Sequence, residues 1–147
     1  MKLLIVSPGK PHSAELVDAI RTYETRLRSA LLVEWAFPAA GSKDTEGAAI
    51  LKFLKQDDYV VLLDERGKEI DSPGLAAILE KKLTSGTKRL VFVIGGAFGV
   101  SDAVTERADT VISLSKLVFP HMLVRLLLVE QLYRAWSIRT GGKYHHA

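Results

Sequence analysis

Two side chains suited to chemistry, His121 and Arg125, lie four residues apart near the start of a long apolar segment, residues 118–136. On a helix, residues with this spacing project from the same face. An imidazole titrates near neutral pH and is suited to proton transfer, while a guanidinium binds phosphate or supports a site. The alternative is structural: Arg125 pairs with a carboxylate and His121 only begins the helix. We predict that both residues belong to a functional site.

The C-terminal tail carries a second group of candidate residues. It is basic, jointed by glycines and aromatic, a composition that suits phosphate contact and stacking on an unpaired base. The predicted RNA-binding residues are Arg139, Lys143, Tyr144, His145 and His146. Two adjacent histidines without a third ligand at suitable spacing do not favour a metal site, so we predict none.

Three loops that follow predicted strands, residues 64–67, 95–99 and 115–120, are candidates for ligand binding. Ligands of open parallel α/β sheets lie at the carboxyl ends of the strands. Residues 95–99 (GGAFG) hold three glycines, which let a ligand approach the backbone, although a simple tight turn is the alternative. Residues 115–120 (SKLVFP) are mainly apolar and must cover something, either a purine ring or a neighbouring helix. The GxGxxG and Walker fingerprints are absent.

These loops are positioned by alternating strands and helices. Helices are expected at 14–28, 48–55, 72–86, a short stretch from 101, and from 121 onward; residues 39–47 are expected to form a loop. Strands are expected at 3–7, 31–37, 59–63, 89–94 and 110–114. Near-continuous apolar strands are typical of a parallel sheet with helices on both faces, so we predict an α/β fold. Without repeats or linkers, residues 1–147 are expected to form a single domain.

Composition and charge exclude several classes of protein. The absence of cysteine excludes disulfides and thiolate metal sites, and the first residues read as a strand rather than a signal peptide. Residues 1–115 hold 15 Lys and Arg against 16 Asp and Glu, whereas residues 116–147 hold five against one. This basic excess favours an anionic partner, nucleic acid first, with a solubilising tail as the alternative.

The apolar segment 118–136 is not a membrane span. A span needs about 20 mainly apolar residues, and here charged residues interrupt any window of that length. A helix that is apolar nearly all round is buried on more than one side. In a domain of this size, we expect a second subunit to cover part of it.

The strings LLDERGKEIDSP, FVIGGAFGVS, ISLSKLVFPHMLVRLLLVEQLYRAWSI and KYHH occur in this order. In sequence and spacing they resemble the RlmH (YbeA-type) family of SPOUT methyltransferases, over the whole chain. The resemblance implies an α/β fold with a C-terminal trefoil knot, a cytoplasmic homodimer, and S-adenosylmethionine as cofactor. It further implies methylation of N3 of a pseudouridine in the helix 69 loop of 23S rRNA, on the assembled 70S ribosome.

For such a reaction, the helix face shared by His121 and Arg125 and the composition of the tail indicate roles for individual residues, and the resemblance implies the cofactor contacts. We expect His121 to accept or relay the N3 proton, Arg125 to support the site or bind phosphate, and Tyr144 with His145 to position the nucleotide. The expected cofactor-binding residues are Leu63, Gly96, Ser115, Lys116, Leu117, Val118, Phe119 and Pro120.

Two departures from the family pattern and three other functions bear on this interpretation. The family more often has GGPxG where this chain has GGAFG, and it commonly ends in YHRE where this chain ends in YHHA. The second departure puts the role of His146 in doubt. The alternatives are a SPOUT methyltransferase acting on another RNA such as tRNA, a non-catalytic RNA-binding module, and a nucleotide-dependent enzyme of flavodoxin or Rossmann type.

Overall fold

The computed structural model describes residues 1–146; Ala147, the last residue of the predicted domain, lies outside the described residues. Ten elements alternate along the chain: β1 (Lys2–Val6), α1 (Ala14–Leu27), β2 (Val33–Ala36), α2 (Lys43–Leu51), β3 (Tyr59–Glu69), α3 (Ser72–Thr84), β4 (Arg89–Ile94), α4 (Asp102–Arg107), β5 (Thr110–Ser113) and α5 (His121–Arg139).

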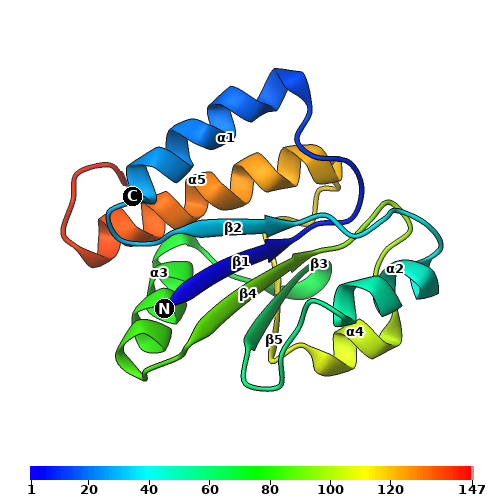
Figure 1. The fold of residues 1–147 in the computed structure, drawn as a ribbon. Helices are drawn as coiled ribbons and strands as arrows, with labels where there is room; N and C mark the ends of the chain where they lie inside the picture. Colours follow the sequence, from blue (N-terminus) through cyan, green and yellow to red (C-terminus); the bar gives the residue numbers. More distant parts are fainter. Residues whose placement is uncertain (147) are drawn as a thin grey trace.

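The five strands form one parallel sheet in the order β2-β1-β4-β3-β5. β1, β4 and β3 lie in the interior of the sheet (Figure 1), and residues 90–94 of β4 are apolar and buried. Such strands must be covered on both faces. The predicted α/β class with a parallel sheet is therefore confirmed.

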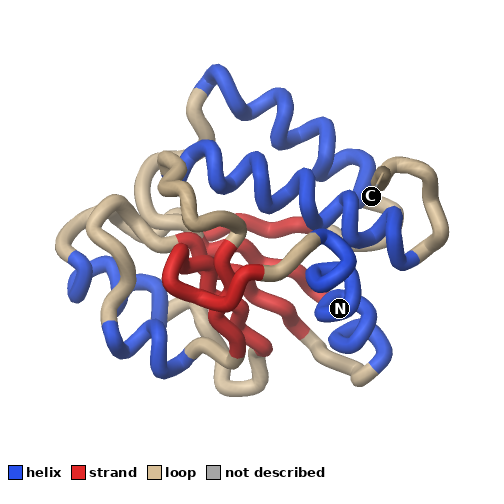
Figure 2. The backbone as a smooth tube through the Cα atoms, turned by 180° about the vertical axis from the view of Figure 1, so that it is seen from behind, coloured by secondary structure: helices blue, strands red, loops and turns tan. Residues whose placement is uncertain are grey.

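Two apolar cores lie on opposite faces of the sheet. α1, α3 and α5 cover one face, where Ile20, Leu79 and Leu132 pack against strand residues such as Phe92. α2 and α4 cover the other face and contribute Ile50 and Val104. Figure 2 shows the loops gathered between these two layers at one end of the sheet. Each strand thus alternates its side chains between two helical layers.

The start of α2 corrects the predicted loop at 39–47. Helix α2 begins at Lys43, because the Ser42 hydroxyl caps it by accepting a hydrogen bond from the Thr45 N–H at 3.2 Å. Gly47, the last residue of the expected loop, is required by packing. A Cβ at this position would clash with the Ser101 side chain at the start of α4.

β3 is longer than its apolar run. The predicted strand ended at residue 63, but pairing with β5 continues to Glu69 after an irregularity between Leu63 and Lys68, both of which pair with Ile112. Gly67 lies flat on the β5 backbone, and a Cβ there would come within 3 Å of Ile112 backbone atoms. The second half of β3 thus lies closely against β5. The trefoil knot stays a prediction.

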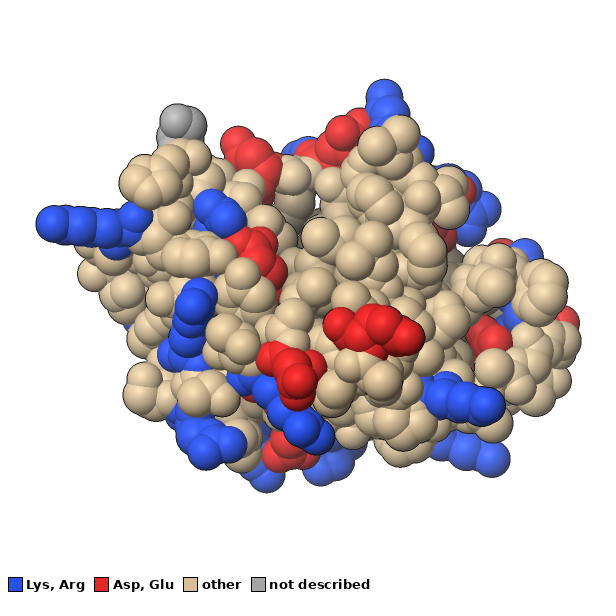
Figure 3. Space-filling view, turned by 90° about the horizontal axis from the view of Figure 1, so that it is seen from above, with Lys and Arg blue, Asp and Glu red and all other residues tan. Residues whose placement is uncertain are grey.

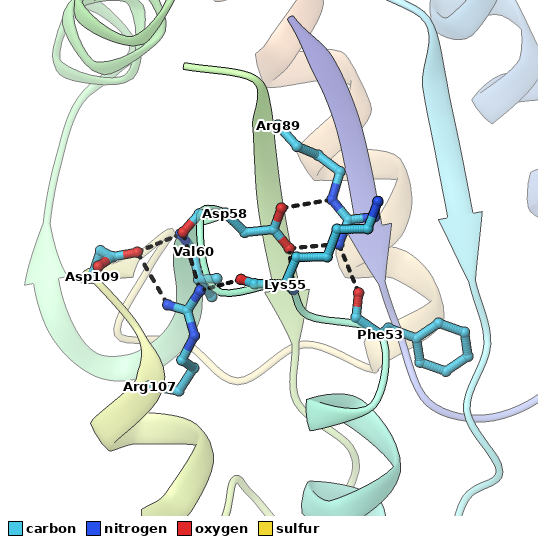
Figure 4. Close-up of polar contacts among 7 residues, drawn as sticks. All are labelled: Phe53, Lys55, Asp58, Val60, Arg89, Arg107 and Asp109. Carbon is cyan, nitrogen blue, oxygen red and sulfur yellow. Dashed lines mark hydrogen bonds and ion pairs between the residues drawn. The ribbon is translucent and has the colours of Figure 1, made fainter.

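A polar network ties together the opposite, amino ends of β3, β4 and β5 (Figure 4). Arg89 donates to both carboxylate oxygens of Asp58, which is buried. Arg107 donates to the Asp58 carbonyl oxygen, and Asp109 accepts from the Val60 N–H at 2.8 Å. Charged groups thus hold the amino ends of these strands together, whereas ligands of such sheets bind at the carboxyl ends.

No helix among residues 1–146 is long and apolar enough to cross a membrane.

Candidate functional site

A cavity of about 640 Å³ lies at the carboxyl ends of β3, β4 and β5. The three segments singled out in the sequence form it together with the start of α5, but residues 64–67, which were expected to form a loop, lie within β3. Its walls are made by Leu63, Asp64, Glu65, Arg66, Ile94, Gly95, Gly96, Ala97, Gly99, Val100, Leu114, Ser115, Leu117, Val118, Phe119, Pro120, His121 and Val124. We call it the larger cavity; its volume is in the range of small-molecule sites.

Seven of the eight residues expected to bind a cofactor line the larger cavity: Leu63, Gly96, Ser115, Leu117, Val118, Phe119 and Pro120. The exception is Lys116. Its ammonium lies 3.5 Å from Glu69 Oε1, and the residue is not part of the cavity wall. The apolar loop therefore contributes its backbone and its apolar side chains, while its one cation pairs with the end of β3.

The apolar loop exposes side chains that usually lie inside a protein. Leu117 and Val118 are 70% and 78% exposed. The Ser115 hydroxyl shapes the loop by accepting a hydrogen bond from the Leu117 N–H at 2.9 Å. Within residues 1–146, neither of the two covers considered for this loop lies over Leu117 and Val118. Exposed apolar side chains beside a cavity are typical of a site that a ligand or partner covers.

The glycine loop is both a tight turn and a cavity wall. The Gly99 N–H donates to the Gly96 carbonyl oxygen at 3.1 Å, and Gly99 has a φ of +86° that favours glycine. A Cβ on Gly95 would clash with Val100, and one on Gly96 would clash with the Glu46 carboxylate. The missing side chains therefore let Val100 and Glu46 pack directly against the backbone at these two positions, which line the cavity.

His121 begins α5 and lies at the wall of the larger cavity, as predicted for a site residue. Its side chain is half-buried. Burial, and next the positive charge of Arg125, lower the pKa of His121 below 6.5, while the negative charge of Glu46 opposes them. The imidazole is thus neutral at pH 7 and able to accept a proton.

Arg125 lies on the same face of α5 but outside the cavity. Its side chain is fully buried, and it donates to Ser7 Oγ at 2.7 Å and to the carbonyl oxygens of Lys10 at 2.8 Å and Pro8 at 3.2 Å. Backbone carbonyls therefore take the place of the carboxylate partner considered in the sequence. Gly9, in the loop that Arg125 holds, packs against His121. Arg125 thus positions the loop beside His121.

The tail folds back along α5, far from the cavity of the same chain. The Tyr144 hydroxyl donates to Glu130 Oε1 at 3.0 Å, and its ring packs on Tyr133. Burial, followed by hydrogen bonds with Tyr23 and Glu130, raises the pKa of Tyr144, so the hydroxyl stays protonated. Glu130 is nine residues from His121, which is roughly 14 Å along the helix. The structure does not bring Tyr144 and His121 together within one chain.

Most of the basic side chains of residues 116–146 already have partners. Arg134 pairs with Glu130 at 2.6 Å and contacts His145 Nδ1, and Arg139 pairs with Glu80. Lys143 and His146 are exposed. Figure 3 shows acidic side chains interspersed among basic ones on the side that α1 covers. The C-terminal charge excess is therefore spread over paired groups. Within residues 1–146, no group of three or more His, Asp or Glu is placed to hold a metal ion.

Sequence reasoning missed Glu46. This residue is 5% exposed and lies against Gly96, on an adjoining pocket that His121 also lines. Because residues 39–47 were expected to form a loop, the sequence did not indicate a buried position for this residue. Ser42 followed by acidic residues in the next turn is a helix-start signal that could have placed Glu46 on a helix. Asp64 and Arg66, which pair at 2.9 Å in the cavity wall, lie in the part of β3 that was expected to form a loop.

Comparison with known proteins agrees with this arrangement. The family model described as "Predicted SPOUT methyltransferase" matches residues 1–145. A relative from Parabacteroides distasonis, named "Ribosomal RNA large subunit methyltransferase H", is 42% identical, with 99% of each chain covered. Relatives of the same name from Christiangramia forsetii and Geotalea daltonii are 40% and 38% identical. They cover 99% of this chain, and the match spans 99% and 100% of their own lengths.

Proposed function

The chain belongs to the SPOUT methyltransferase family, and we propose that it transfers a methyl group from S-adenosylmethionine to N3 of a pseudouridine in 23S rRNA. The proposed acceptor lies in the helix 69 loop of the assembled 70S ribosome. The observation that carries the proposal is the larger cavity, built by three segments at the carboxyl ends of neighbouring strands with His121 in its wall. The names of the full-length relatives support the rRNA substrate.

The residues of the larger cavity fit this methyl donor. Leu114, Leu117 and Val118 offer apolar surface for a purine, and Gly95 and Gly96 line the cavity without side chains of their own. Asp64 adds a charged acceptor to the wall for hydroxyl or amino groups. When bound, S-adenosylmethionine supplies a methyl group made electrophilic by its sulfonium. The protein then has to orient the acceptor and remove one proton.

We assign the proton to His121. When N3 forms its bond to the methyl carbon, the carbon–sulfur bond breaks and the N3 hydrogen leaves as a proton. A half-buried imidazole whose pKa lies below 6.5 is neutral at pH 7 and accepts it. Arg125 does not touch either reactant in this proposal. It positions the loop of residues 7–10 against His121.

The proposed roles of the tail and of a homodimer depend on each other. Tyr144 is held beside Glu130, away from the larger cavity of its own chain. If Tyr144 and His145 position the nucleotide, they do so at the cavity of a second subunit. Half-buried apolar side chains of α5 (Leu123, Leu126 and Leu127) support such an interface. Arg139, Lys143 and His146 remain the proposed phosphate contacts of a cytoplasmic enzyme whose 147 residues form one domain.

Methyl transfer to defined RNAs tests the proposed function. Labelled S-adenosylmethionine is supplied with 70S ribosomes, free 50S subunits or tRNA, all from a strain that lacks the gene. We expect incorporation into 70S ribosomes. Incorporation into tRNA alone would overturn the ribosomal substrate in favour of another RNA. Failure to bind S-adenosylmethionine in calorimetry would instead indicate a non-catalytic RNA-binding protein.

A further inference from the structure

A second, smaller pocket of about 350 Å³ adjoins the larger cavity. Gly96, Ala97 and His121 line both spaces and therefore form a shared wall. The smaller pocket is otherwise lined by Pro8, Ala40, Gly41, Glu46 and Phe98. Its volume lies at the lower end of the range for ligand sites and is ample for a pyrimidine ring. A methyl donor in the larger cavity thus has a space for an acceptor next to it.

Glu46 is the only acid among the residues of the smaller pocket. Its side chain is buried, with Oε2 accepting a hydrogen bond from the Gly41 N–H at 2.9 Å and Oε1 packed against Gly96. Within residues 1–146, no Lys or Arg forms an ion pair with it. A buried carboxylate needs hydrogen-bond donors, and here the protein supplies one.

The chemistry of the smaller pocket suits a neutral base and not a phosphate. An unpaired carboxylate repels phosphate oxygens and accepts hydrogen bonds from ring N–H groups. Phe98, at 75% exposure, offers an aromatic surface on which a base can stack. Apart from His121, which the proposed function assigns to the N3 proton, the remaining residues are small or apolar, so Glu46 is the side chain left to recognise the edge of the base.

The position of Glu46 beside the residues that line both spaces determines which ring atom it meets. On the proposed function, N3 of the base faces the methyl donor where the two spaces meet. Glu46 lies against Gly96, one of the shared residues, but does not line the larger cavity, so it meets a ring atom near N3 and not N3 itself. In pseudouridine the ring nitrogen N1, one carbon away from N3, carries an N1–H donor, because the ribose is attached at C5. In uridine the ribose occupies N1, and no hydrogen is present.

We propose that the smaller pocket holds the acceptor base and that the Glu46 carboxylate accepts the N1–H of pseudouridine, which selects pseudouridine over uridine. This inference rests on the proposed function and adds a specificity-determining residue to it. Glu46→Gln is the sharpest variant. The amide oxygen can keep the bond from the Gly41 N–H, while the amide NH₂ replaces Oε1 and presents a donor to the N1–H donor.

The experiment compares two sets of 70S ribosomes from strains lacking the methyltransferase gene. One set carries pseudouridine at the acceptor position, and the other carries uridine because the pseudouridine synthase is also deleted. The ratio of kcat/KM for the two sets is measured for wild type and Glu46→Gln. Asp44→Asn, an exposed acid in the same turn of α2, is the matched control.

We expect the wild-type ratio to favour pseudouridine strongly and to fall about 10- to 100-fold in Glu46→Gln, the range expected for loss of one charged hydrogen bond. It should stay constant in Asp44→Asn. Glu46→Gln that methylates pseudouridine and keeps the wild-type ratio overturns the role of Glu46 alone. Wild type that methylates both sets equally well overturns it without any variant. Wild type that methylates neither set overturns the proposed function itself.

Discussion

Arg125 Nη1 donates to the Lys10 carbonyl oxygen at 2.8 Å and thereby joins α5 to a loop 115 residues away in the sequence. The guanidinium also contacts Ser7 and Pro8 of this loop. The loop reaches both His121 and the smaller pocket, through Gly9 and Pro8. One buried cation therefore connects the packing of the helix to the geometry of the site.

Removal of this cation should destabilise the fold. Arg125→Ala leaves the Ser7 hydroxyl and the carbonyl oxygens of Pro8 and Lys10 without their donor, which should cost about 3 kcal/mol and lower Tm by roughly 6 to 12 °C. Arg139→Ala, on the same helix but at the surface, loses one exposed ion pair and should change stability by less than about 1 kcal/mol. Thermal unfolding of both variants checks the contrast, and equal shifts would contradict the structural role of Arg125.

The pH dependence of methyl transfer should report His121. Because burial and the charge of Arg125 lower its pKa, the single-turnover rate should rise from acid pH to a plateau with an apparent pKa below 6.5. His121→Ala should lose about 100-fold or more in rate, as well as this acid limb. A near-normal rate for the variant across pH 6–9 would remove His121 from proton transfer.

The exposed apolar loop should contribute to cofactor affinity. Val118→Ser removes apolar surface that a bound cofactor would cover, a loss of about 1.5 kcal/mol that raises Kd roughly tenfold. Leu32→Ser is the control, since Leu32 is also exposed, at 60%, but precedes β2 at the far end of the sheet. Calorimetry with S-adenosylmethionine should separate the two variants, whereas an unchanged Kd for Val118→Ser would place the cofactor elsewhere.

The network at the amino ends of the strands should affect stability without affecting chemistry. Asp58→Ala leaves Arg89 without its carboxylate and should cost about 3 kcal/mol at pH 7. Burial alone would raise the pKa of Asp58, but hydrogen bonds from Arg89 and the Lys55 N–H hold it below 3.8. The wild type should therefore keep its full advantage above about pH 4 and lose it as the pH falls through the lowered pKa. Urea unfolding measures this difference in the free energy of unfolding. An Asp58→Ala variant that is as stable as the wild type but has a lower kcat/KM would contradict the prediction.

The sequence predicted those features of the fold that depend on residues close together in the chain. The apolar run at 89–94 became β4, and the three segments after the apolar runs formed the larger cavity. The features that were missed depend on distant contacts. Gly47 is required by Ser101, β3 extends because β5 pairs with it, and Arg125 finds its partners in residues 7–10. The role of Glu46 was missed for the same reason, since it depends on a pocket shared with Gly96 and His121, which are distant in the sequence.

The central claim, methylation of a ribosomal pseudouridine at N3, is tested most directly by identifying the product nucleoside. 70S ribosomes from a strain lacking the gene are incubated with the protein and labelled S-adenosylmethionine. The 23S rRNA is then digested to nucleosides and analysed by mass spectrometry. The account predicts that the label appears in 3-methylpseudouridine from the helix 69 loop. Label in any other nucleoside, or only in tRNA that accompanies the ribosomes, would contradict it.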